Sequence, residues 1–490
     1  MSIRIRTLVL LTATLVLASG TGSTVAAQPA PVPAAASVQT AHAAQGPAER
    51  QFRAWLAAFN TGNRERYQTF LSVQFPSRAA RVDGDMGFFL RTGGFEVRKV
   101  ESATATRVTF LIEDRAWDRF ARAVLEVEAS APHRILSLAV DLAPRPADLP
   151  VRRLTEAELA GAVRAKIEAA AASGAFSGAV LVARRGTVIV DAAKGLANRA
   201  QRTPNMLDTR FRMGSMNKMF TATAVMQLVQ AGKVKLDAPL GTYIAGYPNQ
   251  DVATKVTLHH LLTHTGGTGN IFGPEFDKHR LELRTLDDYV TLYGARGLAF
   301  EPGSKWDYSN YGFLLLGVVV ERVSGQSYYD YVRDHIFKPA GMTASGSEPE
   351  DQAVPGRAVG YMQQQGAWVP NTDTLPYRGT SAGGGYTTVG DLLRFASALT
   401  GRVLLDAKHT DLLTTGKVDT GDGDKYAYGF EESVDGGARR IGHSGGAPGM
   451  NGDLRIFPDS GYVVAALANT GFGASEVASW IGERLPLPVR

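Results

Sequence analysis

Hydrophobic positions change their spacing along the chain and so predict the order of its elements. Phe52, Trp55, Leu56 and Phe59 recur at helical spacing, and a second helix is expected around residues 67–71. Four strand-like stretches follow, at residues 95–100, 107–112, 123–128 and 135–141. Helices followed by an antiparallel sheet predict a small α+β module over residues 47–149.

Prolines at positions 144, 146 and 150 interrupt both helix and strand and mark the boundary of a second region. This region, residues 151–490, opens with a helical pattern at 156–172 and a hairpin at 178–192. It ends with strands at 439–443, 452–457 and 462–468 and a last helix at 475–485. Strands at both ends with helices between them predict one central antiparallel sheet flanked by helices. The expected fold class is a two-domain α/β (α+β) protein.

The first residues have the pattern of an export signal. A basic start with Arg4 and Arg6 precedes an apolar run at 8–18 and the small residues Val25, Ala26 and Ala27. We expect a signal peptide over residues 1–27, followed by an Ala/Pro-rich linker over residues 28–46. The apolar run is too short to span a bilayer, so no stable membrane anchor is expected, with an uncleaved anchor as the alternative. The predicted location is the periplasm or the medium.

Composition narrows the chemistry that the chain can perform. Of its 490 residues, 44% are hydrophobic and 20% charged, which is ordinary for globular proteins. The net charge is only +5 and no block of Lys and Arg occurs, so no nucleic-acid partner is expected. The absence of cysteine excludes thiol catalysis, thiolate metal sites and disulfides. Oxygen nucleophiles, carboxylates and histidines remain.

Ser215 and Lys218 form a Ser-x-x-Lys sequence at the start of a strong helical pattern that runs from residue 219 to residue 230. Lys218 follows three residues later and lies over the same face of the helix. A serine is a poor nucleophile until a base removes its proton, and a desolvated lysine can lose its own proton and act as that base. A serine N-cap followed by a surface lysine would give the same letters.

Tyr308 and Asn310 precede another helical pattern and project together if their segment is extended. A nearby lysine can lower the pKa of a tyrosine, which would let Tyr308 act as base towards Ser215 and as acid towards a leaving group. Asn310 could bind the lysine or a substrate amide. The alternatives are a buried aromatic residue and an N-cap, and the similar Tyr247-Pro248-Asn249 sequence reads as a turn.

Residues 442–446, Gly-His-Ser-Gly-Gly, end a predicted strand with small residues. Small residues such as Gly445 and Gly446 would let a substrate lie along the strand, with backbone N–H groups directed into a cleft. The related His-Thr-Gly-Gly sequence at 264–267 follows a helical run and is expected to be a helix end. His260 and His264 are four residues apart, but no glutamate in zincin order accompanies them, so we expect no metal and no cofactor.

In their order, Ser-x-x-Lys, Tyr-x-Asn and His-x-Gly, these three elements resemble the serine β-lactamase and penicillin-binding-protein-like hydrolases. The class C-like branch, which includes esterases and D-amino-acid peptidases, is the most similar. Further matches are Leu-Leu-Thr-His-Thr-Gly-Gly at 261–267, Ser-Ala-Gly-Gly-Gly at 381–385 and Phe-Pro-Asp at 457–459. The resemblance implies a β-lactamase/transpeptidase-like fold over about residues 170–485. The order of elements in the first module loosely resembles an NTF2-like (cystatin-type) fold.

The resemblance also implies roles for the matched residues. Ser215 would be the acylated nucleophile, with Lys218 and Tyr308 handling its proton. Asn310 would position the substrate and His443 would line the opposite wall. The backbone N–H groups of Ser215 and Gly446 would form the oxyanion hole, beside Gly445 in the same strand.

The implied partner is a small-molecule ester, peptide or β-lactam-like substrate. Efficient β-lactamases of this kind usually carry lysine where this chain has His443, and a neutral imidazole attracts a carboxylate less than an ammonium does. This departure favours an esterase or D-amino-acid peptidase with at most weak β-lactamase activity. A catalytically silent binding or sensing protein and a cell-wall D-Ala carboxypeptidase remain as alternatives, and the oligomeric state is open.

Overall fold

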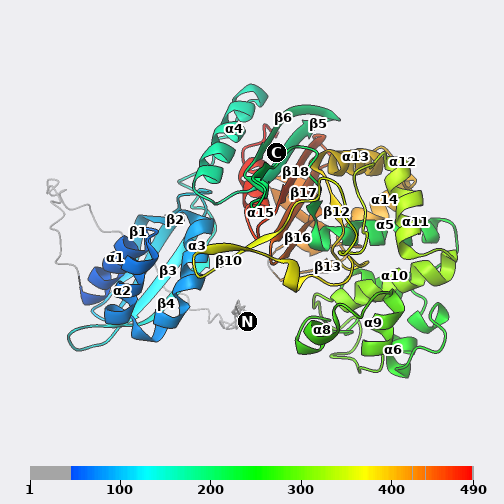
Figure 1. Cartoon of the computed structure of the whole chain (residues 1–490), viewed down its shortest axis with the longest axis horizontal. Helices are drawn as coiled ribbons and strands as arrows, with labels where there is room; N and C mark the ends of the chain where they lie inside the picture. Colours follow the sequence, from blue (N-terminus) through cyan, green and yellow to red (C-terminus); the bar gives the residue numbers. More distant parts are fainter. Residues whose placement is uncertain (1–45, 422, 436, 488–490) are drawn as a thin grey trace, which may run out of the picture. The chain divides into compact units, whose positions relative to one another are not determined.

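A computed structural model describes residues 46–421, 423–435 and 437–487 (Figure 1). The predicted signal peptide and, except for Gly46, the predicted linker lie outside these residues. The described chain begins with a small α+β part and continues into a larger α/β part.

The α+β part contains three helices followed by a four-stranded antiparallel sheet. The elements are α1 (Pro47–Phe59), α2 (Arg64–Gln74), α3 (Val82–Thr92), β1 (Phe95–Ala103), β2 (Arg107–Asp114), β3 (Phe120–Val127) and β4 (Ile135–Leu142). Phe52 of α1 stacks on Phe110 of β2 with ring centroids 4.1 Å apart. The predicted helices and strands are present, whereas α3 was missed because Gly84 and Gly87 weaken its helical pattern. Its likeness to the NTF2-like fold stays a prediction.

The larger part is built on one antiparallel sheet of eight strands in the order β13-β14-β15-β16-β17-β18-β5-β6. Its strands are β5 (Gly178–Arg184), β6 (Thr187–Lys194), β13 (Val418–Asp419), β14 (Lys425–Tyr426), β15 (Glu431–Asp435), β16 (Ala438–Ala447), β17 (Met450–Phe457) and β18 (Tyr462–Ala468). The first and last strands of this part of the sequence therefore pair in its middle, where β18 lies beside β5. The predicted central antiparallel sheet is confirmed.

Both faces of this sheet are buried at β18, which explains why this strand is apolar at every position. In β18, Ala465 and Leu467 belong to one hydrophobic cluster, and Val464 and Ala466 belong to another. The first cluster includes residues of α5 (Asn217–Gln230), α10 (Asn310–Ser324) and α13 (Val389–Thr400), and the second includes residues of α4 (Glu156–Ala172) and α15 (Ala474–Gly482). Side chains alternate between the faces of a strand, so helices on both sides require an uninterrupted apolar sequence.

Shorter elements complete the larger part between β6 and β13. The helices are α6 (Gln250–Lys255), α7 (Leu258–Leu262), α8 (Pro274–His279), α9 (Leu286–Tyr293), α11 (Tyr328–Val332), α12 (Lys338–Ala340) and α14 (Ala407–Thr414). Three pairs of short strands are β7 (Leu196–Asn198) with β8 (Thr203–Pro204), β9 (Phe211–Arg212) with β12 (Tyr386–Thr387), and β10 (Tyr361–Gln364) with β11 (Ala367–Pro370). They form the inserted region that the sequence predicted.

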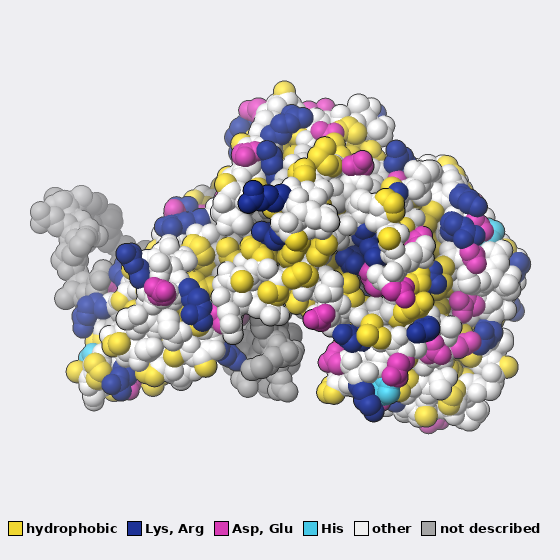
Figure 2. Space-filling model, in the orientation of Figure 1, with side chains coloured by type: hydrophobic (Ala, Val, Ile, Leu, Met, Phe, Trp, Pro, Cys, Tyr) yellow, Lys and Arg dark blue, Asp and Glu magenta, His cyan; other side chains and the backbone are white. Residues whose placement is uncertain are grey.

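Charged side chains of both signs are interspersed over the described residues of the face in Figure 2. In the described part of the chain, we find no helix with the length and apolar character needed to cross a membrane.

Two glycine substitutions compare a closely packed position, between α10 and the segment after β11, with an open position in α4. A Cβ atom on Gly317 would lie 2.3 Å from Ser381 Oγ and 2.7 Å from Leu286 Cδ1. We expect Gly317→Ala to lower the free energy of unfolding by about 1–3 kcal/mol, because the added methyl overpacks this contact. A Cβ atom on Gly161, inside α4, would meet nothing within 4 Å. Gly161→Ala should therefore raise that free energy by about 0.5–1 kcal/mol. Urea unfolding of both variants measures the contrast, and changes of the same sign would contradict it.

Candidate active site

Ser215 lies in a short 3₁₀ turn, Gly214–Met216, directly before α5. Gly214 has a φ of +55°, and a Cβ atom there would lie 3.0 Å from the backbone nitrogen of Gly446. A glycine is needed for this conformation and for this close approach. The turn therefore brings Ser215, which is only partly buried, next to the end of β16.

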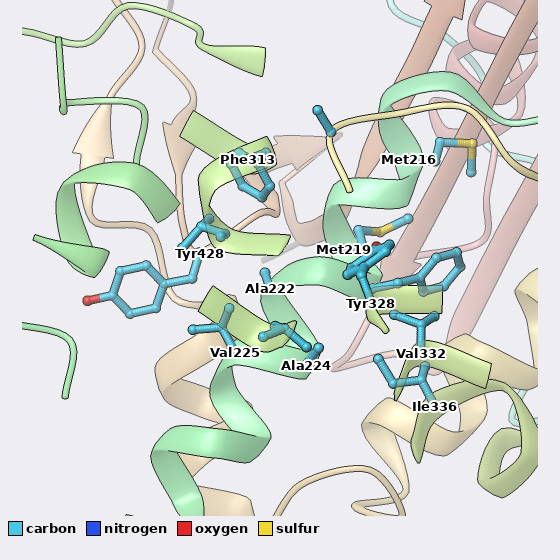
Figure 3. Packing of buried hydrophobic residues seen from close by; sticks show 14 of the residues in the cluster. Met216, Met219, Ala222, Ala224, Val225, Phe313, Tyr328, Val332, Ile336 and Tyr428 are labelled. Atoms are coloured by element: carbon cyan, nitrogen blue, oxygen red, sulfur yellow. The ribbon is translucent and has the colours of Figure 1, made fainter. Parts of the chain in front are cut away.

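The helix that follows is held on nearly all sides by apolar contacts. Figure 3 shows Met219, Ala222 and Val225 of α5 among side chains that include Phe313 of α10 and Tyr328 of α11. Of its 14 residues, 11 are buried. A helix packed in this way fixes the direction of each side chain, including that of Lys218.

The amine of Lys218 is fully buried and has three polar neighbours. Its Nζ donates to Asn310 Oδ1 at 2.7 Å and to the carbonyl oxygen of Ala382, and it lies 3.3 Å from Ser215 Oγ. The amide oxygen and the carbonyl oxygen can only accept hydrogen bonds. A neutral amine has two N–H donors and one lone pair, so these two acceptors leave the lone pair for the Ser215 hydroxyl.

Burial also sets the protonation state of this amine. Desolvation lowers the pKa of Lys218 well below its ordinary value. No carboxylate is recorded within ion-pair distance of Nζ among the described residues, so nothing there compensates a buried ammonium. Burial therefore favours the neutral amine over the ammonium.

Tyr308 and Asn310 reach the same amine from the start of α10. Ser309 between them has an extended backbone and caps the helix by accepting a hydrogen bond from the N–H of Gly312. Lys218 Nζ lies 4.7 Å from the centroid of the Tyr308 ring. The structure thus brings together the two side chains that the sequence expected to project together. Asn310 Nδ2 also donates to Asn270 Oδ1, at 3.0 Å.

The pKa of Tyr308 moves in the opposite direction from the one expected. Burial raises it above the ordinary value for a phenol, the carboxylate of Glu431 raises it further, and the hydrogen bond with Ser215 lowers it only in part. The expectation that a nearby lysine lowers this pKa is wrong, because desolvation of the phenol outweighs the effects that lower it. The phenol of Tyr308 is protonated at neutral pH.

The glycines of β16 allow the strand to lie against the turn that carries Ser215. A Cβ atom on Gly445 would lie 2.0 Å from the carbonyl oxygen of Met213, so any other residue would push the strand away. Gly383 lies less close to the same turn, because its Cβ would be 3.3 Å from the carbonyl oxygen of Gly214 and 3.5 Å from the Ser215 nitrogen. Backbone from two segments thus lies near the serine.

The side chain of His443 is buried beneath the exposed surface of β16. It is only 2% exposed, its Nε2 is 2.9 Å from the hydroxyl of Tyr426, and its ring centroid is 6.4 Å from that of Tyr308. Desolvation lowers the pKa of His443, against an opposing effect of Glu431. The imidazole is therefore neutral at neutral pH, and the accessible groups of this wall belong to Ser444 and Gly446.

Sequence reasoning missed several groups that complete the site. His264, expected only as a helix end, is buried with its ring 4.2 Å from that of Tyr308, and its Nδ1 accepts a hydrogen bond from the N–H of Ser309. Tyr426 and Glu431 come from short strands with no motif, so no sequence signal pointed to them. Tyr247, the rival tyrosine, bonds the hydroxyl of Tyr311 at 3.0 Å instead.

The His260 and His264 pair has no further ligand beside it. Within residues 46–421, 423–435 and 437–487, no three His, Asp or Glu side chains are grouped in a way that could hold a metal ion. His260 Nδ1 accepts a hydrogen bond from the N–H of Thr257 at the start of α7.

Comparison with known proteins agrees with this arrangement of strands and helices. The model of the family described as Beta-lactamase matches residues 163–485. The chain belongs to this family. The resemblance read from the three sequence elements is thereby confirmed, and with it the α/β fold of the larger part.

Relatives within the β-lactamase family carry different functional names. A penicillin-binding protein structure from Bacillus halodurans is 34% identical and has a TM-score of 0.59, covering 67% of this chain and 99% of its own. Esterase EstB from Burkholderia gladioli is 36% identical over 41% of this chain and 56% of its own length. A D-stereospecific amidohydrolase structure from a Streptomyces species is 28% identical, has a TM-score of 0.55, and covers 65% of this chain and 97% of its own. This is a family of serine hydrolases that includes enzymes acting on esters and on amides.

The buried amine makes a prediction about stability and pH. Lys218 in the unfolded chain keeps its proton up to about pH 10.4, whereas the folded protein releases it at a lower pH. The unfolded state then binds one proton more, so the free energy of unfolding rises with pH between the two pKa values, by about 1.4 kcal/mol per pH unit. We expect this rise in the wild type relative to Lys218→Met, measured by urea unfolding between about pH 8.5 and about pH 9.5.

Lys255→Met serves as the control for this pH dependence. Lys255 is partly exposed and lies 3.3 Å from Asp251 on the surface of α6. Its removal should leave the pH dependence of the wild type unchanged in the same interval. Parallel curves for the wild type and Lys218→Met would show that Lys218 is protonated in the folded protein.

Proposed function

We propose that the protein is a serine hydrolase that cleaves an ester or amide through an acyl-enzyme on Ser215. The observation that carries the proposal is the surroundings of the Lys218 amine. Two acceptors occupy its N–H groups and desolvation keeps it neutral, so its lone pair faces the Ser215 hydroxyl. A base in hydrogen-bonding reach of a serine is the arrangement that nucleophilic catalysis requires.

In the acylation step, the Ser215 proton moves to Lys218 Nζ while Oγ bonds to the substrate carbonyl carbon. The carbonyl oxygen gains negative charge, which the backbone N–H groups of Ser215 and Gly446 would stabilise. The C–O or C–N bond then breaks, and the leaving group takes a proton. Tyr308 is suited to deliver that proton because its phenol is protonated and hydrogen-bonds with Ser215. The proton on Lys218 restores the phenol.

In the second step, water releases the acyl group by the reverse route. Lys218 takes a proton from the water, the hydroxide bonds to the acyl carbon, and Ser215 Oγ leaves with the proton of Tyr308, which the proton on Lys218 then replaces. Asn310 holds Lys218 in place through Oδ1 throughout both steps. No cofactor takes part in this sequence.

The groups of the β16 wall support a choice of substrate class. His443 is neutral and covered, so this wall lacks the ammonium that would attract a carboxylate. An ester or a D-amino-acid amide or peptide is therefore favoured over a β-lactam, for which weak activity is expected. The family members named as an esterase and as a D-stereospecific amidohydrolase support this choice.

Export and a separate first module are part of the same proposal. The basic, apolar and small residues at 1–27 support cleavage after Ala27 and release into the periplasm or the medium. Residues 47–149 would then form an α+β module before the hydrolase domain at 151–490. The intact mass of the exported protein should be that of a chain beginning at Gln28, and an uncut N-terminus would contradict the signal peptide.

Labelling by a fluorophosphonate tests the nucleophile. We expect one adduct per chain by intact mass, absent in Ser215→Ala, because an activated serine attacks the phosphorus. Lys218→Met should slow labelling on the order of 10²–10⁴-fold, the size of a general-base contribution. Lys255→Met, a lysine removed from the surface of α6, should label at the wild-type rate.

Well-folded protein that does not label would contradict the enzyme and favour a silent binding or sensing protein. If labelling occurs, a panel of esters, D-amino-acid amides, a D-Ala-D-Ala peptide and a β-lactam separates the remaining classes. Release of D-Ala faster than ester cleavage would favour the cell-wall carboxypeptidase instead.

A further inference from the structure

Strand β16 loses its partner strand on one side at the residues that line the active site. Strand β15 pairs with β16 from Asp435 opposite Ala438 to Glu431 opposite Gly442, and the pairing stops there. Residues His443 to Ala447 continue along β17 on their other side. Glu431, the first residue of β15, therefore stands at the end of the free edge along which a substrate would lie.

The carboxylate of Glu431 reaches over the groups that begin this edge. Its Oε1 accepts a hydrogen bond from Ser444 Oγ at 3.2 Å and lies 3.8 Å from His443 Nδ1. The side chain is 32% exposed, so a bound molecule can approach it. The hydroxyl of Ser444, which could otherwise donate to a substrate carboxylate, is directed to a carboxylate of the protein.

Cations near Glu431 do not cancel its charge. His443 is neutral, and Arg455 is held by Asp453 at 3.2 Å and by Asp435 at 2.8 Å. No Lys or Arg ion pair of Glu431 is recorded in the part of the chain that the structure describes. The negative charge of Glu431 also acts at the centre of the site, where it raises the pKa of both Tyr308 and Tyr426.

The leaving group of a substrate is the part that meets this charge. It must receive a proton, and the protonated phenol of Tyr308 is the donor in the proposed mechanism. Tyr308 faces the His443 ring, and Glu431 lies beside His443. A substituent on the leaving group would therefore lie against Ser444 and Glu431, which cover the buried His443.

We propose that Glu431 is a specificity-determining residue that makes the site discriminate against leaving groups bearing a carboxylate and favour neutral or cationic ones. This inference rests on the proposed acyl-enzyme mechanism and names its substrate class. It goes further than the absence of an ammonium at His443, since a missing attraction lowers affinity for an anion, whereas a fixed carboxylate repels it.

Three acetate esters of para-substituted phenols test the proposal, with a carboxylate, a carboxamide or a trimethylammoniomethyl group on the ring. The quantity compared is kcat/KM of Glu431→Gln divided by that of the full-length wild type, so intrinsic ester reactivity cancels. The carboxamide ester measures the effect common to all three substrates, because removal of the charge also changes the pKa of Tyr308. Relative to the carboxamide ratio, we expect a rise of about tenfold for the carboxylate ester, which corresponds to one pKa unit of interaction, and a fall for the cation.

Glu432→Gln is the matched control for this experiment. It removes the same charge one residue along β15, from a side chain that is ion-paired with Arg439. Its three ratios should be equal to one another, while those of Glu431→Gln differ. The glutamine at 431 keeps an oxygen that can accept from Ser444, and equal thermal midpoints would verify folding.

Each result distinguishes the two proposals. Equal ratios for the three esters in Glu431→Gln would overturn the role of Glu431 while leaving the acyl-enzyme intact. Absence of labelling at Ser215, or ester cleavage that survives Ser215→Ala, would overturn the proposed function itself. If Glu431→Gln does not fold, the wild type alone still decides. For each ester, the kcat/KM of the wild type is divided by the rate constant for hydrolysis by hydroxide. This ratio should be smaller for the carboxylate ester than for the other two esters, and a carboxylate ester with the largest ratio would contradict the proposal.

Discussion

The arrangement of the site depends on a lysine amine that is buried without a counterion. A charged amine in such a place costs several kcal/mol, whereas a neutral amine needs only partners for its two N–H groups. Asn310 and the carbonyl of Ala382 are those partners, and Ser215 is what remains for the lone pair. Burial likewise keeps the phenol of Tyr308 protonated, because desolvation raises its pKa.

The fold keeps water away from this amine by bringing distant segments together at short range. Helix α5 is buried between the sheet and α10, and the backbone of β16 approaches the turn of Ser215 more closely than any residue but glycine allows. The central sheet can support this arrangement because helices cover both of its faces. A site of low polarity around one amine is thus a property of the whole larger part and not of one motif.

The sequence predicted the architecture and the reactive groups well where local patterns are strong. Sequence patterns predicted the strands around residues 178–192 and 452–468 and the helices after Ser215 and Asn310. In these elements the spacing of hydrophobic residues and the residue types at the ends indicate the same structure. The structure brings Ser215, Lys218, Tyr308 and Asn310 together, as the resemblance to the family implied. Helix α3 was missed because two glycines and grouped aromatic residues hide its periodicity.

Other features could not be read from the sequence, because they arise from contacts between distant segments. The pKa of Tyr308 depends on how completely its own phenol is desolvated and on the charge of Glu431, which only packing determines. Glu431 and Tyr426 belong to short strands whose pairing brings them to the site, and neither lies in a motif. The carbonyl of Ala382 is a backbone group, so its importance leaves no trace in residue type.

The protonation state of Lys218 in the folded protein tests the account most directly. Lysine labelled with ¹³C at Cε reports it by NMR, with Lys218→Met to assign the signal and Lys255→Met to check the assignment method. We expect the Lys218 signal at neutral pH to have the chemical shift of a neutral amine. A Lys218 signal that stays at the ammonium position and titrates with the exposed lysines near pH 10.4 would contradict it.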